Sequence, residues 1–450
     1  MSGRRSRVAL LALTCVGAAF QSLPVQAAPR AAKGPYLTGL SDTGVEVRFE
    51  LDAPGSASVE VRSDGVDAGR AGARFESREA STMHVVRASG LRPLARYAYV
   101  VRAGGAAVGH GTFVTAPRDD AAAPLTFLVY GDDRSNHAAH AAVVQAMREV
   151  PSDFLIHTGD LVAAGGSAEE WQTFFEIEAP LLRERSLFAA LGNHELYDDS
   201  AGASFARYFG WSPEAGAAPR VYGTARVGSV RLFWINGMHA WDSGEERAWL
   251  EGELARADAE PGLVWRIVVV HHSPWSSGPH GPNERLVDGR VPELLAAHHV
   301  QLLLAGHDHL YERGDAGAIK YVISGGAGAP LYRMGQPMAT TRRLETAYHF
   351  VEAHVSGDAL QIVAHGVDGT IIERCGLHVG GPWDCDAAGA GPAPASAAPA
   401  TAAAAPQTSR ATIPRCACDV PGVASGGAGL TLLLGAGAAA SLARRRCRRG

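Results

Sequence analysis

The feature that most constrains this 450-residue chain is an apolar run that repeatedly ends in a residue of metal-ligand type. There are five such runs, and each is followed within a few positions by Asp, Asn or His. Short apolar runs are typical of buried strands, and helix-like stretches lie among them. Alternating strands and helices predict a layered α/β fold. The expected strands cover 125–130, 154–158, 187–191, 267–270 and 300–304, and the expected helices cover 138–149, 169–182 and 246–257.

The polar residues after these runs are expected to form one site. In an open α/β sheet the carboxyl ends of the strands converge on one crevice. A single Gly-Asp pair is typical of a turn and a single His of a packed or solvated side chain, but five occurrences at the same strand position favour a shared function. Carboxylate, amide and imidazole donors suit divalent or trivalent metal ions. Two ions about 3.5–4 Å apart would clamp a phosphoryl group and lower the pKa of a bound water, whose hydroxide would attack phosphorus.

The order of the motifs resembles the five blocks of the calcineurin-like metallophosphoesterases. These motifs are Gly131-Asp132, Gly159-Asp160, Gly192-Asn193-His194-Glu195, His271 and Gly306-His307-Asp308-His309. The stretch from Gly306 to Arg313 is similar to the corresponding block of purple acid phosphatases, which also carry a fibronectin-like domain. The resemblance covers about 35–374. It implies a layered metallophosphoesterase β-sandwich flanked by helices, preceded by a small all-β fibronectin type III-like sandwich, and two bound metal ions (Fe, Mn or Zn).

The same resemblance assigns roles to individual residues. Asp160 would bridge the two ions. His194 would contact the phosphoryl group and protonate the leaving oxygen, and His280 stands where purple acid phosphatases place substrate-contacting histidines, although an exposed loop histidine is the alternative. His272 remains an alternative ligand to His271. One metal site would be completed by Asn193, His271 and His307, and the other by Asp132 and His309.

Two positions depart from the family pattern. Most relatives place a His two residues after the first Asp, and here this is Arg134; purple acid phosphatases place a Tyr three residues after the second Asp, and here this is Ala163. Arg134 is expected to bind phosphate, since a guanidinium suits a phosphate oxygen. His137 or His140 could substitute as ligands of the Asp132 site. We predict a colourless enzyme with one tightly held and one weaker ion.

Residues 33–117 alternate apolar and polar side chains in short runs separated by Gly, Asp, Ser and Pro, which favours a small β-sandwich. The strand-like runs include 45–51 and 57–61. The stretch from Leu91 to Tyr99 resembles the tyrosine corner of a fibronectin type III domain. The predicted metallophosphoesterase domain follows over 122–374.

The ends of the chain predict export. Residues 1–27 combine a basic start, a short apolar core and a small-x-small cleavage site, as in a signal peptide. Residues 375–386 form an extension bounded by Cys375 and Cys385, which an oxidising compartment would join in a disulfide. An Ala/Pro-rich linker spans 387–415. Residues 416–450 contain cysteines, an apolar span and an arginine cluster; they resemble the sorting tails of myxobacterial surface proteins, which implies a membrane contact and a processing protease, with a plain anchor as the alternative.

These observations favour an exported metal-dependent phosphomonoesterase, similar to acid phosphatases, that acts on a phosphate ester at the cell envelope or cell surface. A phosphodiesterase acting on nucleotides or glycerophosphodiesters would use the same metals. A non-catalytic surface binding protein with a degenerate metal site is the alternative of another class. The formal net charge of −5 provides no global basic field to recruit nucleic acid.

Overall fold

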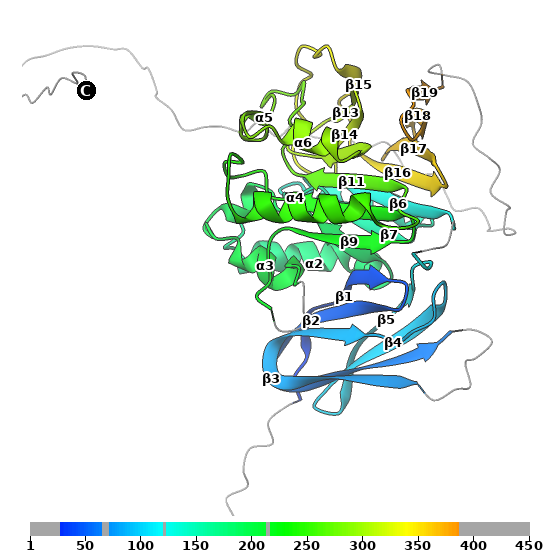
Figure 1. Ribbon diagram of the computed structural model, residues 1–450. Helices are drawn as coiled ribbons and strands as arrows, with labels where there is room; N and C mark the ends of the chain where they lie inside the picture. The colour runs from blue at the N-terminus through cyan, green and yellow to red at the C-terminus, as the bar shows by residue number, and fades with distance from the viewer. Residues whose placement is uncertain (1–27, 65–71, 120–122, 213–216, 387–450) are drawn as a thin grey trace, which may run out of the picture. The chain divides into compact units, whose positions relative to one another are not determined.

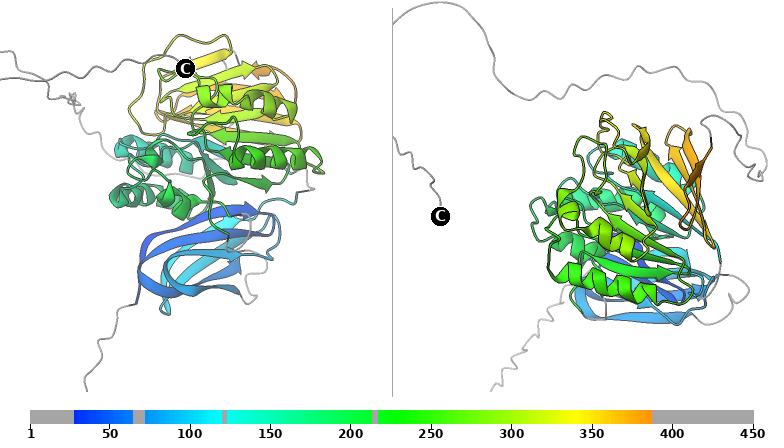
Figure 2. Two further views of the ribbon diagram at one scale, coloured as in Figure 1. Left: turned by 60° about the vertical axis from the view of Figure 1, so that its left-hand side comes forward. Right: turned by 45° about the horizontal axis from the view of Figure 1, so that its top comes forward.

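The computed structural model describes residues 28–64, 72–119, 123–212 and 217–386. Figures 1 and 2 show their strands and helices. The predicted signal peptide, linker and C-terminal tail lie outside these residues. In the part of the chain that is described, no helix is long and apolar enough to cross a membrane.

The first of two sheets holds three of the five predicted strands. These strands, β6, β7 and β8, run parallel to one another. Antiparallel strands β16 to β19 extend the sheet beyond β6. The strands are β6 (Leu125–Tyr130), β7 (Phe154–His157), β8 (Ser186–Ala189), β16 (His349–Ser356), β17 (Ala359–Gly366), β18 (Ile371–His378) and β19 (Trp383–Cys385).

The second sheet holds the other two predicted strands, β11 and β12. Its order is β15-β13-β14-β12-β11-β10-β9, and β10, β11, β12 and β14 are parallel. The parallel strands are fully buried, as expected for strands covered on both faces. The bounds are β9 (Gly223–Val227), β10 (Val230–Ile235), β11 (Trp265–Val270), β12 (Leu302–Ala305), β13 (Tyr311–Ala316), β14 (Ile319–Ser324) and β15 (Thr341–Glu345).

Side-chain alternation along the strands builds four layers. In β6, Phe127 and Val129 enter the core between the two sheets, while Leu128 and Tyr130 pack on the opposite face against helices. The helices of that face are α1 to α3, and α4 to α6 cover the outer face of the second sheet (Figure 1). This arrangement confirms the predicted layered α/β fold. The helices are α1 (His137–Arg148), α2 (Ala168–Leu182), α3 (Ala203–Phe209), α4 (Glu245–Asp258), α5 (Glu284–Asp288) and α6 (Val291–Ala297).

The N-terminal part is all-β, with its own buried core. The two runs expected at 45–51 and 57–61 form one long strand, β2, because the segment between them stays extended and is absorbed as a register shift in the pairing with β3. The backbone N–H of Arg92 donates to the hydroxyl of Tyr97 at 2.9 Å, which is the contact expected of a tyrosine corner. The strands are β1 (Ala31–Ser41), β2 (Gly44–Ser63), β3 (Ala73–Ala88), β4 (Arg96–Ala103) and β5 (Ala106–Val114).

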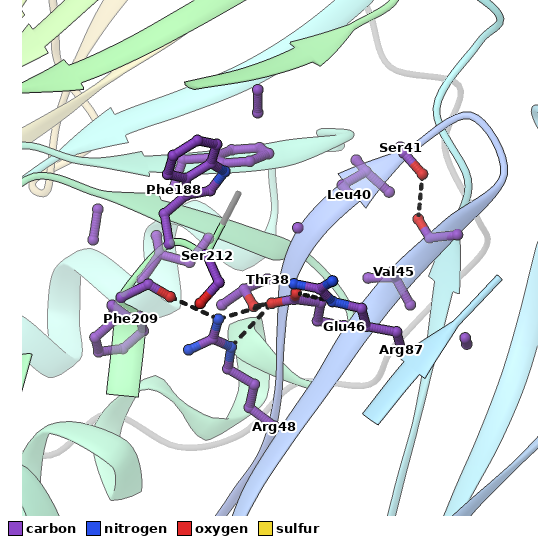
Figure 3. Close-up of a pocket in the computed structure, with 18 of the residues that line it drawn as sticks. Thr38, Leu40, Ser41, Val45, Glu46, Arg48, Arg87, Phe188, Phe209 and Ser212 are labelled. Carbon is purple, nitrogen blue, oxygen red and sulfur yellow. Dashed lines mark hydrogen bonds and ion pairs between the residues drawn. The ribbon is translucent and has the colours of Figure 1, made fainter. Parts of the chain in front are cut away.

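Strand β1 joins the N-terminal strands to the α/β layers. It pairs with β2 and makes one parallel bridge to β8. The buried Tyr36 hydroxyl donates to the carbonyl of Tyr208 at 2.8 Å. A cavity of about 340 Å³ lies at this junction, lined by residues such as Glu46, Arg48 and Phe188 (Figure 3). Arg48 is already bound to Glu46 and to the carbonyls of Tyr208 and Gly210, and no predicted site residue lines the cavity.

The predicted disulfide is present. Cys375 in β18 and Cys385 in β19 face each other across the antiparallel pair, with a Cα–Cα distance of 4.0 Å. This cross-link confirms the pairing inferred from the sequence.

We expect Cys375→Ser to lower the free energy of unfolding by up to about 3 kcal/mol, the chain-entropy value for a loop of this length. Urea denaturation of the variant and of wild type, each with and without reductant, measures the loss. Mass spectrometry of unreduced wild-type peptides checks the bond itself, and two free thiols at these positions would contradict it.

Candidate metal centre

The structure brings all of the predicted site residues to one edge of the two sheets. The predicted ligands follow the carboxyl ends of β6, β7, β8, β11 and β12, as the sequence pattern indicated. Contacts link them with His194, Arg134 and His280 into one group. Their roles as ligands and as catalytic or substrate-binding groups remain predictions, and the geometry below is what the structure adds.

One group of donor atoms surrounds Nε2 of His271. This atom lies 3.1 Å from Oδ1 of Asn193, 3.1 Å from Nδ1 of His307 and 3.3 Å from Oδ1 of Asp160. Donor atoms that share one ion at about 2.0–2.2 Å lie about 3–3.6 Å from each other. A single proton on Nε2 could bond only one of the three neighbours, whereas one metal ion would bind all four. These residues therefore fit a metal ion.

The backbone around these residues is unusual. Among the described residues, eight that are not glycine have a positive φ, and three of the predicted ligands are among them: Asp132 (58°), Asp160 (59°) and His307 (70°). Such conformations cost free energy and cluster at functional sites. The motif glycines allow close approach: a Cβ at Gly192 would overlap Oδ1 of Asp160, and a Cβ at Gly306 would overlap Oδ2 of Asp132.

Hydrogen bonds behind the donors fix their direction. Nδ1 of His271 lies 2.9 Å from the carbonyl of Thr158, which can only accept, so Nδ1 carries the proton and Nε2 faces the site. Burial lowers the pKa of His307, and neighbouring histidines lower it further, so its ring is neutral and can bind a metal. His272 instead contacts the carbonyl of Gly281 through Nε2 and stacks on His307. This arrangement favours His271 over His272 as the ligand.

The role of Glu195 was missed by the sequence analysis, although the residue stood in a quoted motif. Its buried carboxylate accepts hydrogen bonds from four backbone N–H groups, those of Asp160, Leu161, Val162 and Gly192. It thereby ties the turn after β7 to the turn after β8. Glu195 positions two predicted ligands without being one, and only the folded arrangement reveals this.

The second group of donors consists of Asp132, Asp160 and His309, whose ligand atoms lie within 4.8 Å of one another. Oδ1 of Asp132 is buried without a hydrogen-bond partner and lies 3.6 Å from Nε2 of His309. However, the guanidinium of Arg134 also lies here. Its Nε donates to Oδ2 of Asp160 at 3.0 Å, and its Nη2 lies 3.3 Å from Nε2 of His309. With Arg134 in this position, the second group does not fit a metal ion.

His194 and His280 both border the predicted ligands. Nε2 of His194 lies 3.9 Å from Oδ2 of Asp160, and its Nδ1 lies 2.7 Å from the carbonyl of Ala163. Nδ1 of His280 lies 2.9 Å from Oδ1 of the buried Asp308, and its ring stacks 4.3 Å from that of His307. His280 is therefore held at the site by Asp308 and is not a free loop histidine.

A buried cluster behind the site was not predicted. Nε2 of His140 lies 3.0 Å from Oδ2 of Asp133 and 2.8 Å from Oε1 of Glu178, and Nε2 of His157 also reaches Asp133, at 3.2 Å. The suggestion that His140 supplements the Asp132 site is therefore wrong, because α1 directs its ring to this cluster. His137, three residues earlier, is exposed.

The structure next permits a comparison with known proteins. Residues 125–311 match the family model of the calcineurin-like phosphoesterases. The chain is 28% identical over 201 residues to the probable purple acid phosphatase 20 of Arabidopsis thaliana, which covers 42% of this chain and 46% of that protein. It is 24% identical over 261 residues to an uncharacterized protein of Mycobacterium tuberculosis, covering 50% and 49%. The chain thus spans about half the length of these curated relatives.

Two solved structures share the fold. A purple acid phosphatase isolated from yellow lupin seeds has a TM-score of 0.66 at 17% identity and covers 76% of this chain and 74% of its own. The structure of PhoD has a TM-score of 0.63 at 10% identity and covers 81% and 94%. The chain has the purple acid phosphatase-like metallophosphoesterase fold. Together with the family match, this supports a metal-dependent phosphoric ester hydrolase.

Proposed function

We propose that this protein is an exported metal-dependent phosphomonoesterase. The observation that carries the proposal is the set of donor atoms around Nε2 of His271, which come from four strand ends within the matched region and are spaced as donors to one ion. The metal would be Fe, Mn or Zn. When bound, it would supply positive charge for the phosphoryl oxygens and lower the pKa of a water molecule.

The chain itself would bind and orient the ester. His194 directs Nε2 toward the site because the carbonyl of Ala163 holds its Nδ1, so it is placed to exchange a proton with the leaving oxygen. Asp308 orients His280 toward the same space. Arg134 keeps N–H groups next to Asp160, where a phosphate oxygen would be bound.

The proposal of export rests on the predicted signal peptide and sorting tail. The disulfide between Cys375 and Cys385 supports it, because such bonds persist in oxidising compartments. Delivery to the cell envelope or surface, a membrane contact and a processing protease belong to the same proposal. Fractionation of cells that produce the full chain, with peptide mapping of both ends, tests this part.

Comparing p-nitrophenyl phosphate with its bis ester, after loading with Mn, Fe, Zn or Co, tests the activity. We expect faster hydrolysis of the monoester, loss of activity on chelation and recovery when metal returns. Asp160→Asn should abolish the recovery, and the exposed Asp242→Asn should not. Preference for the bis ester would instead establish a phosphodiesterase. No turnover of either ester with any metal would favour a binding protein.

A further inference from the structure

The position of Arg134 bears on how many metal ions the centre holds. The relatives imply metal ions, and the sequence predicts two, one of them weakly held. Of the three donor side chains available to the second ion, Asp160 and His309 are both in contact with the Arg134 guanidinium. The inference below rests on the proposed metal centre and concerns its composition.

The contact with His309 is a directed hydrogen bond. Nδ1 of His309 lies 2.7 Å from the carbonyl of Pro330, so this nitrogen carries the ring proton. Nε2 therefore presents its lone pair, and Nη2 of Arg134 donates to it. Burial lowers the pKa of His309 to about 4, so the ring is neutral near pH 7. The lone pair that a metal would need is thus already used.

The contact with Asp160 is an ion pair in a confined space. Nε of Arg134 donates to Oδ2, while Oδ1 of the same carboxylate faces His271 and the first group of donors. Arg134 has 12% of its side chain exposed and Asp160 has 1%. Arginine stays charged at any physiological pH. Asp160 thus bridges the first group of donors and a guanidinium, as it would bridge two ions.

The donor that remains is Oδ1 of Asp132, since Oδ2 accepts from the backbone N–H of His307 at 2.9 Å. A single carboxylate oxygen is far short of the three or four protein ligands that zinc sites use. Any ion entering here would also approach the positive charge of Arg134. Both effects oppose a second ion.

We propose that Arg134 takes the place of the second metal ion, so that the centre consists of one ion, held by Asp160, Asn193, His271 and His307, and one guanidinium. The guanidinium occupies the donor atoms of Asp160 and His309 that the second ion would use. It supplies a permanent positive charge beside the first ion. The protein should therefore bind one metal ion per chain, where the family pattern predicts two.

Elemental analysis and electron paramagnetic resonance of the Mn²⁺-loaded protein test this without any substrate. After saturation with Mn²⁺ and gel filtration, we expect wild type to retain one ion per chain and to give the six-line signal of an isolated ion. Arg134→Lys, which keeps the charge, should also retain one. Arg134→His removes the guanidinium and adds a ligand, so it should retain two ions with a spin-coupled signal and bind the second about 10–100-fold more tightly than wild type.

The wild-type count decides the proposal even where a variant fails to fold. Two retained ions with a coupled signal in wild type would overturn it, and so would none. Because these measurements need no substrate, they are separate from the proposed function. Two ions with hydrolysis would refute the arginine replacement alone, whereas one ion without hydrolysis would refute the phosphomonoesterase alone.

Discussion

His194→Ala is expected to reduce kcat/KM for p-nitrophenyl phosphate by about 10²–10⁴-fold, the usual contribution of a general acid or base. The structure gives the reason: Nδ1 is held by the carbonyl of Ala163, and Nε2 lies 3.9 Å from Asp160 at the edge of the candidate metal centre. The side chain is not among the donors around His271, so metal content should be unchanged. Steady-state kinetics combined with elemental analysis measures both.

His378→Ala is the matched control, since this histidine is 71% exposed on β18 and contacts the equally exposed Asp358. It should leave kcat/KM and metal content as in wild type. If His194→Ala stays within about twofold of wild type, far below the range for acid–base help, His194 has no role in proton transfer. If it loses the metal as well, its role is structural.

Local patterns in the sequence specify the α/β layers well. The expected helices at 138–149, 169–182 and 246–257 correspond to α1, α2 and α4 within one residue at either end. The N-terminal strands are harder, because their extent depends on pairing between distant segments. Strand β2 continues through a segment rich in turn-forming residues because β3 pairs on both sides of it, and β1 is ordered by contacts with β2 and β8 that no local pattern reveals.

The candidate site shows the same division. Strand ends converge in any such sheet, so the sequence could predict which residues meet. It could not predict where side chains point. His140 turns toward Glu178, which lies 38 residues away, and the guanidinium of Arg134 reaches His309, 175 residues away. Glu195 is a further example, since its function is to accept backbone N–H groups that only the folded turns bring together.

His140→Ala is expected to lower the free energy of unfolding by about 3–5 kcal/mol, the usual result of removing one partner from a buried ion pair. His140 is 2% exposed, and its loss would leave the carboxylates of Asp133 and Glu178 buried with less positive charge. His137→Ala, on the same helix but exposed, is the matched control and should change stability by less than about 0.5 kcal/mol. Urea denaturation of both variants and wild type gives the values.

The size of this loss should depend on pH in a defined direction. Burial by itself would lower the pKa of His140, but the Asp133 and Glu178 carboxylates outweigh it and raise the pKa to about 10. A group whose pKa is raised by folding contributes stability that is complete below its unfolded pKa of about 6.5 and disappears as pH rises through its folded pKa. The difference between wild type and His140→Ala should therefore be largest near pH 6 and shrink toward pH 10. A difference that is the same at both pH values, or below about 1 kcal/mol at pH 6, would mean that His140 is not a buried cation.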